Sequence, residues 1–228
     1  MLLQLKHVSK IYQLGNTDIN ALMDINVNIN KKEFVVIMGP SGSGKSTFLQ
    51  VASMLSEPTS GQIILNNIEV SNYNEVQRAH LRNQQIGFIF QTFNLLPRTS
   101  ALQNVLLPLF YAGKDIDSQD IKKQGELMLE KVGLGDRLNN TPAQLSGGQQ
   151  QRVAIARALI NNPSIIFADE PTGNLDSKSG EDIKKILTNL HHEGKTIIMV
   201  THEDDVAAIA KRKIIFKDGQ IISDQPIK

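Results

Sequence analysis

Residues 34–46 have the sequence FVVIMGPSGSGKS, in which five apolar residues lead directly into a glycine-rich loop. An uninterrupted apolar run of this length is typical of a parallel strand that is buried on both faces. The residues that follow, Thr47 to Leu55, have helical character. A buried strand, a glycine-rich loop that ends in Lys-Ser, and a helix together form the arrangement that binds nucleotide phosphates. This stretch therefore predicts an α/β fold with a nucleotide site.

The glycine-rich loop supplies most of the predicted nucleotide contacts. Its glycines let backbone N–H groups curl around phosphate oxygens, and the N-terminus of the next helix adds a positive dipole. Lys45 is expected to reach the β- and γ-phosphates, and the Ser46 hydroxyl to bind Mg²⁺. A plain glycine-rich turn with a surface lysine does not account for both the strand and the helix. The predicted nucleotide-binding residues are Gly39, Pro40, Ser41, Gly42, Ser43, Gly44, Lys45, Ser46 and Thr47.

Two acidic residues stand at the end of a second apolar strand. Asp169 and Glu170 directly follow Ile165 to Ala168. The carboxyl ends of parallel strands form the ligand-binding edge of an α/β sheet, so acids at this position are suited to a phosphate site. Asp169 is expected to bind Mg²⁺ directly or through water, and Glu170 to polarise the attacking water. Alternatively, the two acids are solvated side chains at a strand end without a functional role, an interpretation that the phosphate loop in the same chain disfavours.

Two polar residues follow other apolar strands. His202 comes two residues after a buried strand predicted over Thr196 to Val200, where it could hydrogen-bond the γ-phosphate or the attacking water. Gln91 comes after Ile86 to Phe90 and could contact both magnesium and water. A lone histidine is more often structural or simply exposed, and Gln91 on its own is also a weak signal of function.

A second anion site is predicted far along the chain. Leu145-Ser146-Gly147-Gly148-Gln149 precedes a strongly helical stretch that ends near Ile160. The two glycines leave backbone N–H groups exposed at the start of this helix, and Ser146 adds a hydroxyl. A serine-capped helix after a flexible turn would explain the helix start, but not its occurrence together with a complete phosphate loop.

The composition is that of an ordinary globular domain. The chain has 228 residues, of which 40% are hydrophobic and 21% charged, enough for one domain with a substantial core. A net charge of +1 gives no electrostatic basis for a nucleic-acid partner, and the lack of cysteine excludes disulfides. The longest apolar run, Val105 to Ala112, contains Pro108 and is far shorter than the ~18 residues of a membrane span. Any membrane part is therefore expected in another chain.

The remaining pattern predicts an α/β core with smaller strands at both ends and a helical insert over residues 92–160. Leu3 to Val8 alternates apolar and polar residues, which is typical of an edge strand. Asp218-Gly219 lies between two short apolar stretches and predicts a hairpin turn.

Together these motifs resemble the ATP-binding-cassette ATPases over nearly the whole chain. Leu145 to Gln149 is the signature sequence of that family, and the order of the other motifs also matches: phosphate loop, Gln91, signature, Asp169-Glu170, Asn174-Leu175-Asp176 and His202. The resemblance implies a RecA-like P-loop NTPase core with a parallel sheet, an antiparallel β subdomain and a helical signature subdomain. All of these would form a single domain over residues 1–228.

The resemblance also implies an activity, the hydrolysis of ATP to ADP and phosphate with Mg²⁺. Each ATP would lie between the phosphate loop of one copy and the signature of a second copy. Tyr12 would stack on adenine, and Asp176 would lie in the loop that couples the two sites. The implied catalytic residues are Lys45, Gln91, Glu170 and His202, the implied metal ligands are Ser46, Gln91 and Asp169, and the signature contacts are Ser146, Gly147, Gly148 and Gln149.

Three segments, residues 87–91, 93–97 and 171–176, look like those of bacterial lipoprotein-releasing and macrolide-exporter ATP-binding subunits. This implies a transporter subunit of the export or envelope-spanning type, at the cytoplasmic face of the inner membrane, with a separate permease. Asn174 departs from the alanine of many cassette proteins. Phe93, Leu95 and Leu96 could receive a short permease helix or could pack the helical insert, and the sequence favours neither.

Other functions agree with parts of the sequence. A regulatory cassette ATPase would signal to a membrane partner, as in cell division, without moving a substrate. Cassette proteins that act on ribosomes or DNA usually have a second cassette or a long coiled coil, which this sequence does not show. A P-loop kinase would lack the signature.

Overall fold

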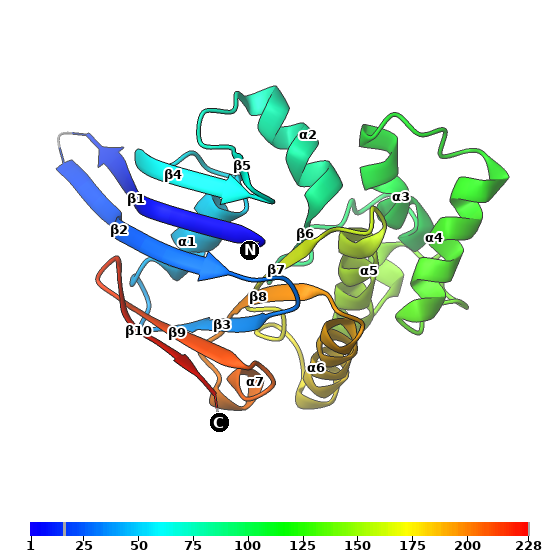
Figure 1. The fold of residues 1–228 in the computed structure, drawn as a ribbon. Coiled ribbons are helices and arrows are strands. Elements are labelled where there is room, and N and C mark those ends of the chain that lie inside the picture. Colours follow the sequence, from blue (N-terminus) through cyan, green and yellow to red (C-terminus); the bar gives the residue numbers. More distant parts are fainter. Residues whose placement is uncertain (16, 228) are drawn as a thin grey trace. The chain divides into compact units, whose positions relative to one another are not determined.

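The computed structural model describes residues 1–15 and 17–227, which divide into two compact units (Figure 1). The first unit comprises Met1–Ala79 and Glu193–Lys228, and the second comprises His80–His192. Helix α2 (Glu75–Gln85) runs across the division. Within the described residues, the helices lack the combination of length and apolar character that crossing a bilayer requires. The predicted helical insert over residues 92–160 falls inside the second unit, and its boundaries stay a prediction.

The first unit contains a four-stranded antiparallel sheet with the order β2-β1-β4-β5. Its strands are β1 (Leu3–Leu14), β2 (Thr17–Ile29), β4 (Ser60–Leu65) and β5 (Ile68–Glu69). Leu5 and Val27 pair across β1 and β2 and are both buried, so one face of the sheet is apolar. The predicted edge strand at the N-terminus is wrong, because β1 pairs with β2 on one side and β4 on the other. The alternation of apolar and polar residues indicates that one face of a strand is buried, but it does not indicate whether the strand pairs with one or two other strands.

Parallel strands carry the phosphate loop of the first unit. β3 (Phe34–Met38) pairs in parallel with β8 (Thr196–Val200) and β9 (Arg212–Lys217), and β9 forms a hairpin with β10 (Gln220–Pro226). β3 and β8 are apolar and almost completely buried, as predicted. Helices α1 (Lys45–Ala52) and α7 (Asp204–Ala207) come after β3 and β8 in the chain. Parallel pairing therefore brings the segments after Met38 and Val200 to the same edge of the sheet.

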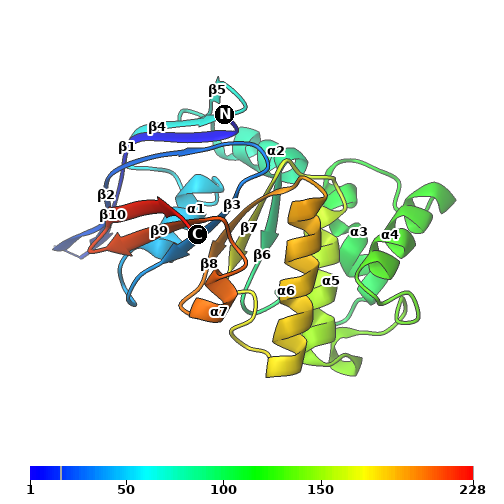
Figure 2. The same cartoon turned by 60° about the horizontal axis from the view of Figure 1, so that its bottom comes forward.

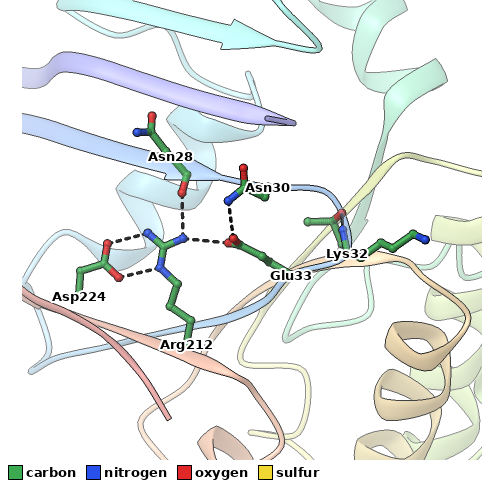
Figure 3. A network of polar contacts seen from close by, with 7 residues as sticks. Asn28, Asn30, Lys32, Glu33, Arg212 and Asp224 are labelled. Carbon is green, nitrogen blue, oxygen red and sulfur yellow. Dashed lines mark hydrogen bonds and ion pairs between the residues drawn. The ribbon is translucent and has the colours of Figure 1, made fainter.

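Arg212 joins three strands of the first unit (Figure 3). Its guanidinium donates to both carboxylate oxygens of Asp224 on β10, each at 2.7 Å. It also donates to Glu33 Oε2 at 2.8 Å and to the Asn28 carbonyl on β2 at 2.9 Å. The bond to Asp224 is the main reason that the pKa of Arg212 is raised above its ordinary value. The network connects the antiparallel sheet with the parallel strands of this unit.

The second unit combines two parallel strands with a group of helices. β6 (Ile86–Ile89) pairs in parallel with β7 (Ile165–Asp169). The helical elements are α3 (Ala101–Tyr111), α4 (Gln119–Lys131), the short 3-10 turn η1 (Pro142–Gln144), α5 (Gly147–Leu159) and α6 (Ser177–His192). α5 and α6 run side by side (Figure 2). α4 packs closely on α3 at Gly125, where a Cβ would lie 2.7 Å from the Leu102 and Leu106 side chains.

Candidate active site

The phosphate loop between β3 and α1 contains two glycines that pack so closely against backbone carbonyls that no side chain would fit there. Gly39 has a φ of 149°, and a Cβ there would lie 2.2 Å from the Phe216 carbonyl oxygen. Gly44 has a φ of 100°, and a Cβ there would lie 2.5 Å from the Ala21 carbonyl oxygen. Gly42 has a φ of 78°, and apart from Gly42 and its two chain neighbours no described atom lies within 4 Å of its Cβ position. The loop is therefore held tightly at both ends and is open in the middle, where its backbone can approach a phosphate.

Two side chains of this loop are buried in a manner that fits a phosphate group. Lys45 is 9% exposed, and its ammonium donates to the carbonyl oxygens of Gly39 at 2.9 Å and Pro40 at 2.8 Å. Ser43 is 2% exposed, and its hydroxyl has no hydrogen-bond partner among the described residues. A buried cation bonded to neutral carbonyls and a buried hydroxyl with unused capacity both gain from an anion. Ser46, the second residue of α1, leaves its hydroxyl at the surface for a metal ion.

His202 lies at the end of the strand beside β3. Ile37 of β3 is opposite Val200 of β8, and the Thr201 N–H donates to the Ile37 carbonyl at 3.2 Å. The His202 side chain is exposed. The histidine is thus at the sheet edge from which the phosphate loop also leaves.

In the second unit, the structure brings Gln91 and Glu170 together. Gln91 Nε2 donates to Glu170 Oε2 at 3.0 Å. Gly173 permits this approach, because a Cβ there would lie 2.8 Å from Gln91 Nε2. Glu170 has a φ of 44°, a left-handed conformation that is uncommon outside glycine and that the surrounding structure must maintain. Asp169, the last residue of β7, is half-buried beside it in sequence.

The predicted signature forms the start of α5. Ser146 caps the helix, with its hydroxyl accepting from the Gln149 N–H at 3.3 Å and its own N–H donating to Gln149 Oε1 at 2.9 Å. Gly148 is buried against α6, where a Cβ would lie 2.5 Å from Ser179 Oγ. Ser179 Oγ in turn donates to Asp176 at 2.7 Å, which is the main reason that the pKa of Asp176 is lowered. Ser179 therefore links the start of α5 to the loop that contains Asp176.

Residues 22–173 match the ABC transporter family. The chain is also 49% identical to the uncharacterized ABC transporter ATP-binding protein YvrO of Bacillus subtilis, over 98% of this chain and 97% of YvrO. The chain belongs to the ABC transporter family.

Other relatives agree with this assignment. A dimeric structure of an ATP-binding cassette in a post-hydrolysis state, bound to ADP and Pi, matches with a TM-score of 0.92 and 44% identity over 100% of this chain and 99% of that chain. The macrolide export ATP-binding/permease protein MacB of Chlorobium phaeobacteroides is 52% identical over 98% of this chain, which spans 34% of MacB. The predicted P-loop NTPase fold is confirmed. The chain is an ATPase of the ABC type and uses ATP with Mg²⁺, as the sequence predicted.

The sequence motifs of this ABC ATPase fall into two groups. The phosphate loop, His202 and Tyr12 belong to the first unit, and the remaining predicted site residues belong to the second. Tyr12 on β1 is 37% exposed, and the Lys10 ammonium lies 4.9 Å from its ring centroid. An exposed ring is what stacking on adenine requires, and that role stays a prediction.

Two polar residues beside the Gln91–Glu170 pair are absent from the predicted site. Asn174 Nδ2 donates to the Gln91 carbonyl at 3.1 Å, although the sequence predicts no site role of its own for Asn174, which departs from the alanine of many cassette proteins. Gln151 on α5 contacts the backbone on both sides of the pair. In the sequence, the position of Asn174 in the turn after Glu170 could have identified it as a site residue. Gln151 could not have been identified in this way, because the three consecutive glutamines at 149–151 do not indicate which one is buried.

The segment after Gln91 is fixed by two helices. Phe93 and Asn94 have φ values of 56° and 49°, and their carbonyls accept hydrogen bonds from the Arg157 guanidinium on α5. The Leu96 N–H donates at 2.8 Å to Asn104, a fully buried residue of α3. Leu96 is 44% exposed. The segment therefore presents apolar surface on a backbone that is held in place.

Proposed function

We propose that this chain is the nucleotide-binding subunit of a bacterial ABC transporter of the export or envelope-spanning type. Two copies would close over ATP and act on a separate permease at the cytoplasmic face of the inner membrane. Relatives of similar length are named ATP-binding proteins, and MacB combines ATP-binding and permease parts under one name. The similar solved cassettes are dimers. These likenesses support a dimeric motor that works on a membrane partner.

The exposed start of α5 carries the proposal. Ser146 is exposed and Gly147 half-exposed, so the first amides of the helix and the serine hydroxyl face solvent as an anion site. The phosphate loop in the first unit is a separate anion site. An ATP bound by the loop of one copy would take its further contacts from α5 of the other, and closure would complete the active site.

The proposed catalytic roles follow from the side chains and their contacts. Glu170 would accept a proton from the attacking water, and Gln91 Nε2 holds one carboxylate oxygen in place. The proposed metal ligands are Gln91 and Asp169 of the second unit and Ser46 of the first unit. When bound, Mg²⁺ would neutralise negative charge on the phosphate oxygens.

Two further residues are proposed to stabilise charge on the phosphates. Lys45 would neutralise the β- and γ-phosphate oxygens, and exposed His202 would donate to the γ-phosphate. Positioning and charge stabilisation are most of what phosphoryl transfer asks of a protein.

Ser146→Glu should prevent ATP-driven dimerisation. A carboxylate at this position would repel the triphosphate, whereas the helix itself tolerates an acid at its N-terminus. In a Glu170→Gln background with ATP and Mg²⁺, the dimer fraction by sedimentation should fall roughly tenfold or more. Ser118→Glu is the matched control, because Ser118 is the N-cap of α4 and its side chain makes no cap hydrogen bond. A dimer unaffected by Ser146→Glu would contradict the sandwich.

We also propose that the permease docks near Phe93, Leu95 and Leu96. Exposed Leu96 and half-exposed Phe93 and Leu95 form apolar surface on a segment anchored to α5, so force from the signature helix could reach it. Leu96→Asp should reduce the fraction of the chain bound to inverted membrane vesicles from its source cells by roughly tenfold, the size of a modest hot spot. Leu127→Asp, at a leucine of α4 that is 56% exposed, should change nothing. Equal binding of both variants would refute this docking site.

A further inference from the structure

We propose that Gln151 is a positioning residue for ATP hydrolysis, whose side-chain amide holds together the two backbone segments that carry Gln91 and Glu170. Gln151 lies on α5 and is fully buried. Its Nε2 donates to the Phe90 carbonyl at 3.3 Å and to the Pro171 carbonyl at 2.7 Å. Phe90 immediately precedes Gln91, and Pro171 immediately follows Glu170. One amide group therefore bonds to a direct neighbour of each member of the pair.

The two acceptors fix the orientation of the Gln151 amide. Both are carbonyl oxygens, so only the NH₂ end of the amide can face them. The other end, Oε1, is buried and has no hydrogen-bond partner among the described residues. A position that needed only volume would be better filled by leucine or methionine, which leave no buried acceptor unused. The glutamine is thus explained by its two hydrogen bonds and not by packing.

The pair held by Gln151 depends on accurate backbone placement. Gln91 and Glu170 meet through a single hydrogen bond of 3.0 Å, and Glu170 adopts a left-handed conformation that its surroundings must maintain. Asn174 adds a second side-chain amide, which bonds to the Gln91 carbonyl at 3.1 Å. The β6–β7 ladder ends at Ile89 and Ala168, so beyond it the buried Gln151 amide and the exposed Asn174 amide are the side-chain amides that tie the two segments together in the described residues.

Gln151 lies on the same helix as the proposed contact with the nucleotide of the second copy. It follows Ser146 by little more than one helical turn, on the helix whose start is the proposed contact with the nucleotide of the second copy. A shift of α5 on closure would therefore act on the Phe90 and Pro171 carbonyls directly. This step rests on the proposed function, whereas the holding role of Gln151 within the second unit does not.

Gln151→Met tests the holding role with little change in volume. We expect kcat for ATP hydrolysis to fall roughly tenfold to a hundredfold, the usual effect of a small displacement of catalytic groups. The Kd for ATP, measured in the Glu170→Gln background, should stay within about twofold, because neither carbonyl that Gln151 holds belongs to the phosphate loop. An unchanged kcat, or an equal loss of ATP affinity, would overturn the inference.

Asn161→Ala is the matched control. Its side-chain amide also makes hydrogen bonds within the second unit, to the carbonyl and Oδ1 of Asn83 at 2.9 Å each, but beyond the other end of α5. Its kcat should stay within about twofold of the parent if the Gln151 effect comes from positioning and not from general loosening of the unit. A matching loss of kcat in Asn161→Ala would refute the assignment.

Hydrogen–deuterium exchange separates the inference from the proposed function. Without nucleotide, peptides covering residues 90–94 and 170–176 should exchange faster in Gln151→Met and not in Asn161→Ala. Faster exchange in a protein that shows no ATP-dependent dimer would preserve the holding role and refute the sandwich mechanism. Unchanged exchange would refute the holding role. If Gln151→Met does not fold, Gln151→Asn keeps a polar amide but withdraws it from the carbonyls, and the same expectations apply.

Discussion

Glu170→Gln should almost abolish ATP turnover while leaving ATP bound. Glu170 Oε2 accepts a hydrogen bond from Gln91 Nε2 at 3.0 Å, and the amide oxygen of a glutamine can accept the same bond. The size and placement of the side chain are therefore preserved, but the negative charge that polarises water and accepts its proton is lost. Removal of a general base costs on the order of 10²–10⁴ in kcat, and a decrease of that size is expected here.

The measurement is phosphate release at saturating ATP, combined with sedimentation to detect an accumulating dimer. Because closure precedes hydrolysis in the proposed mechanism, a slow variant should remain closed with ATP bound. Glu181→Gln is the control, since the Glu181 side chain on α6 is 58% exposed and is not one of the predicted site residues. Normal steady-state hydrolysis by Glu170→Gln would remove the role assigned to this residue.

Two of the buried strands, β3 and β8, were predictable residue by residue, whereas helix α2 was not. β3 and β8 have the predicted bounds, because a short apolar run between turn-forming residues has few alternative interpretations. α2 has no apolar stripe: its buried residue is Arg78, and Val76 is 77% exposed. The helix is strongly polar and buries no large apolar residue, so a search for an apolar face gives little signal for it.

Motif order identified Gln91 and Glu170 as candidates, but their contact depends on details that the motif does not contain. The two residues are 79 positions apart, and they meet because Gly173 leaves room for the Gln91 amide and Glu170 adopts a left-handed backbone. Gln151 is a harder case. Its burial follows from the phase of α5 relative to β6 and β7, which depends on how the helix packs and not on any local signal.

Lys45→Met should weaken ATP binding by about a hundredfold without lowering the stability of the protein. The Lys45 ammonium is nearly buried and bonds to the neutral carbonyls of Gly39 and Pro40. Charge-assisted hydrogen bonds contribute about 1.5–3 kcal/mol, and because Lys45 is expected to reach both the β- and γ-phosphates, the upper end applies, which corresponds to about a hundredfold in Kd. Methionine fills a similar volume and avoids the cost of burying a charge, so the free energy of unfolding should change by less than about 1 kcal/mol.

The two quantities are measured separately, by nucleotide titration and by urea denaturation without nucleotide. Lys31→Met, at an exposed position before β3, is the control and should alter neither. A loss of stability equal to the loss of binding would mean that Lys45 supports the loop and not the phosphates. Weak binding in a protein as stable as the parent would mean that the buried ammonium is retained for its ligand, because the fold alone gains nothing from placing a charge there.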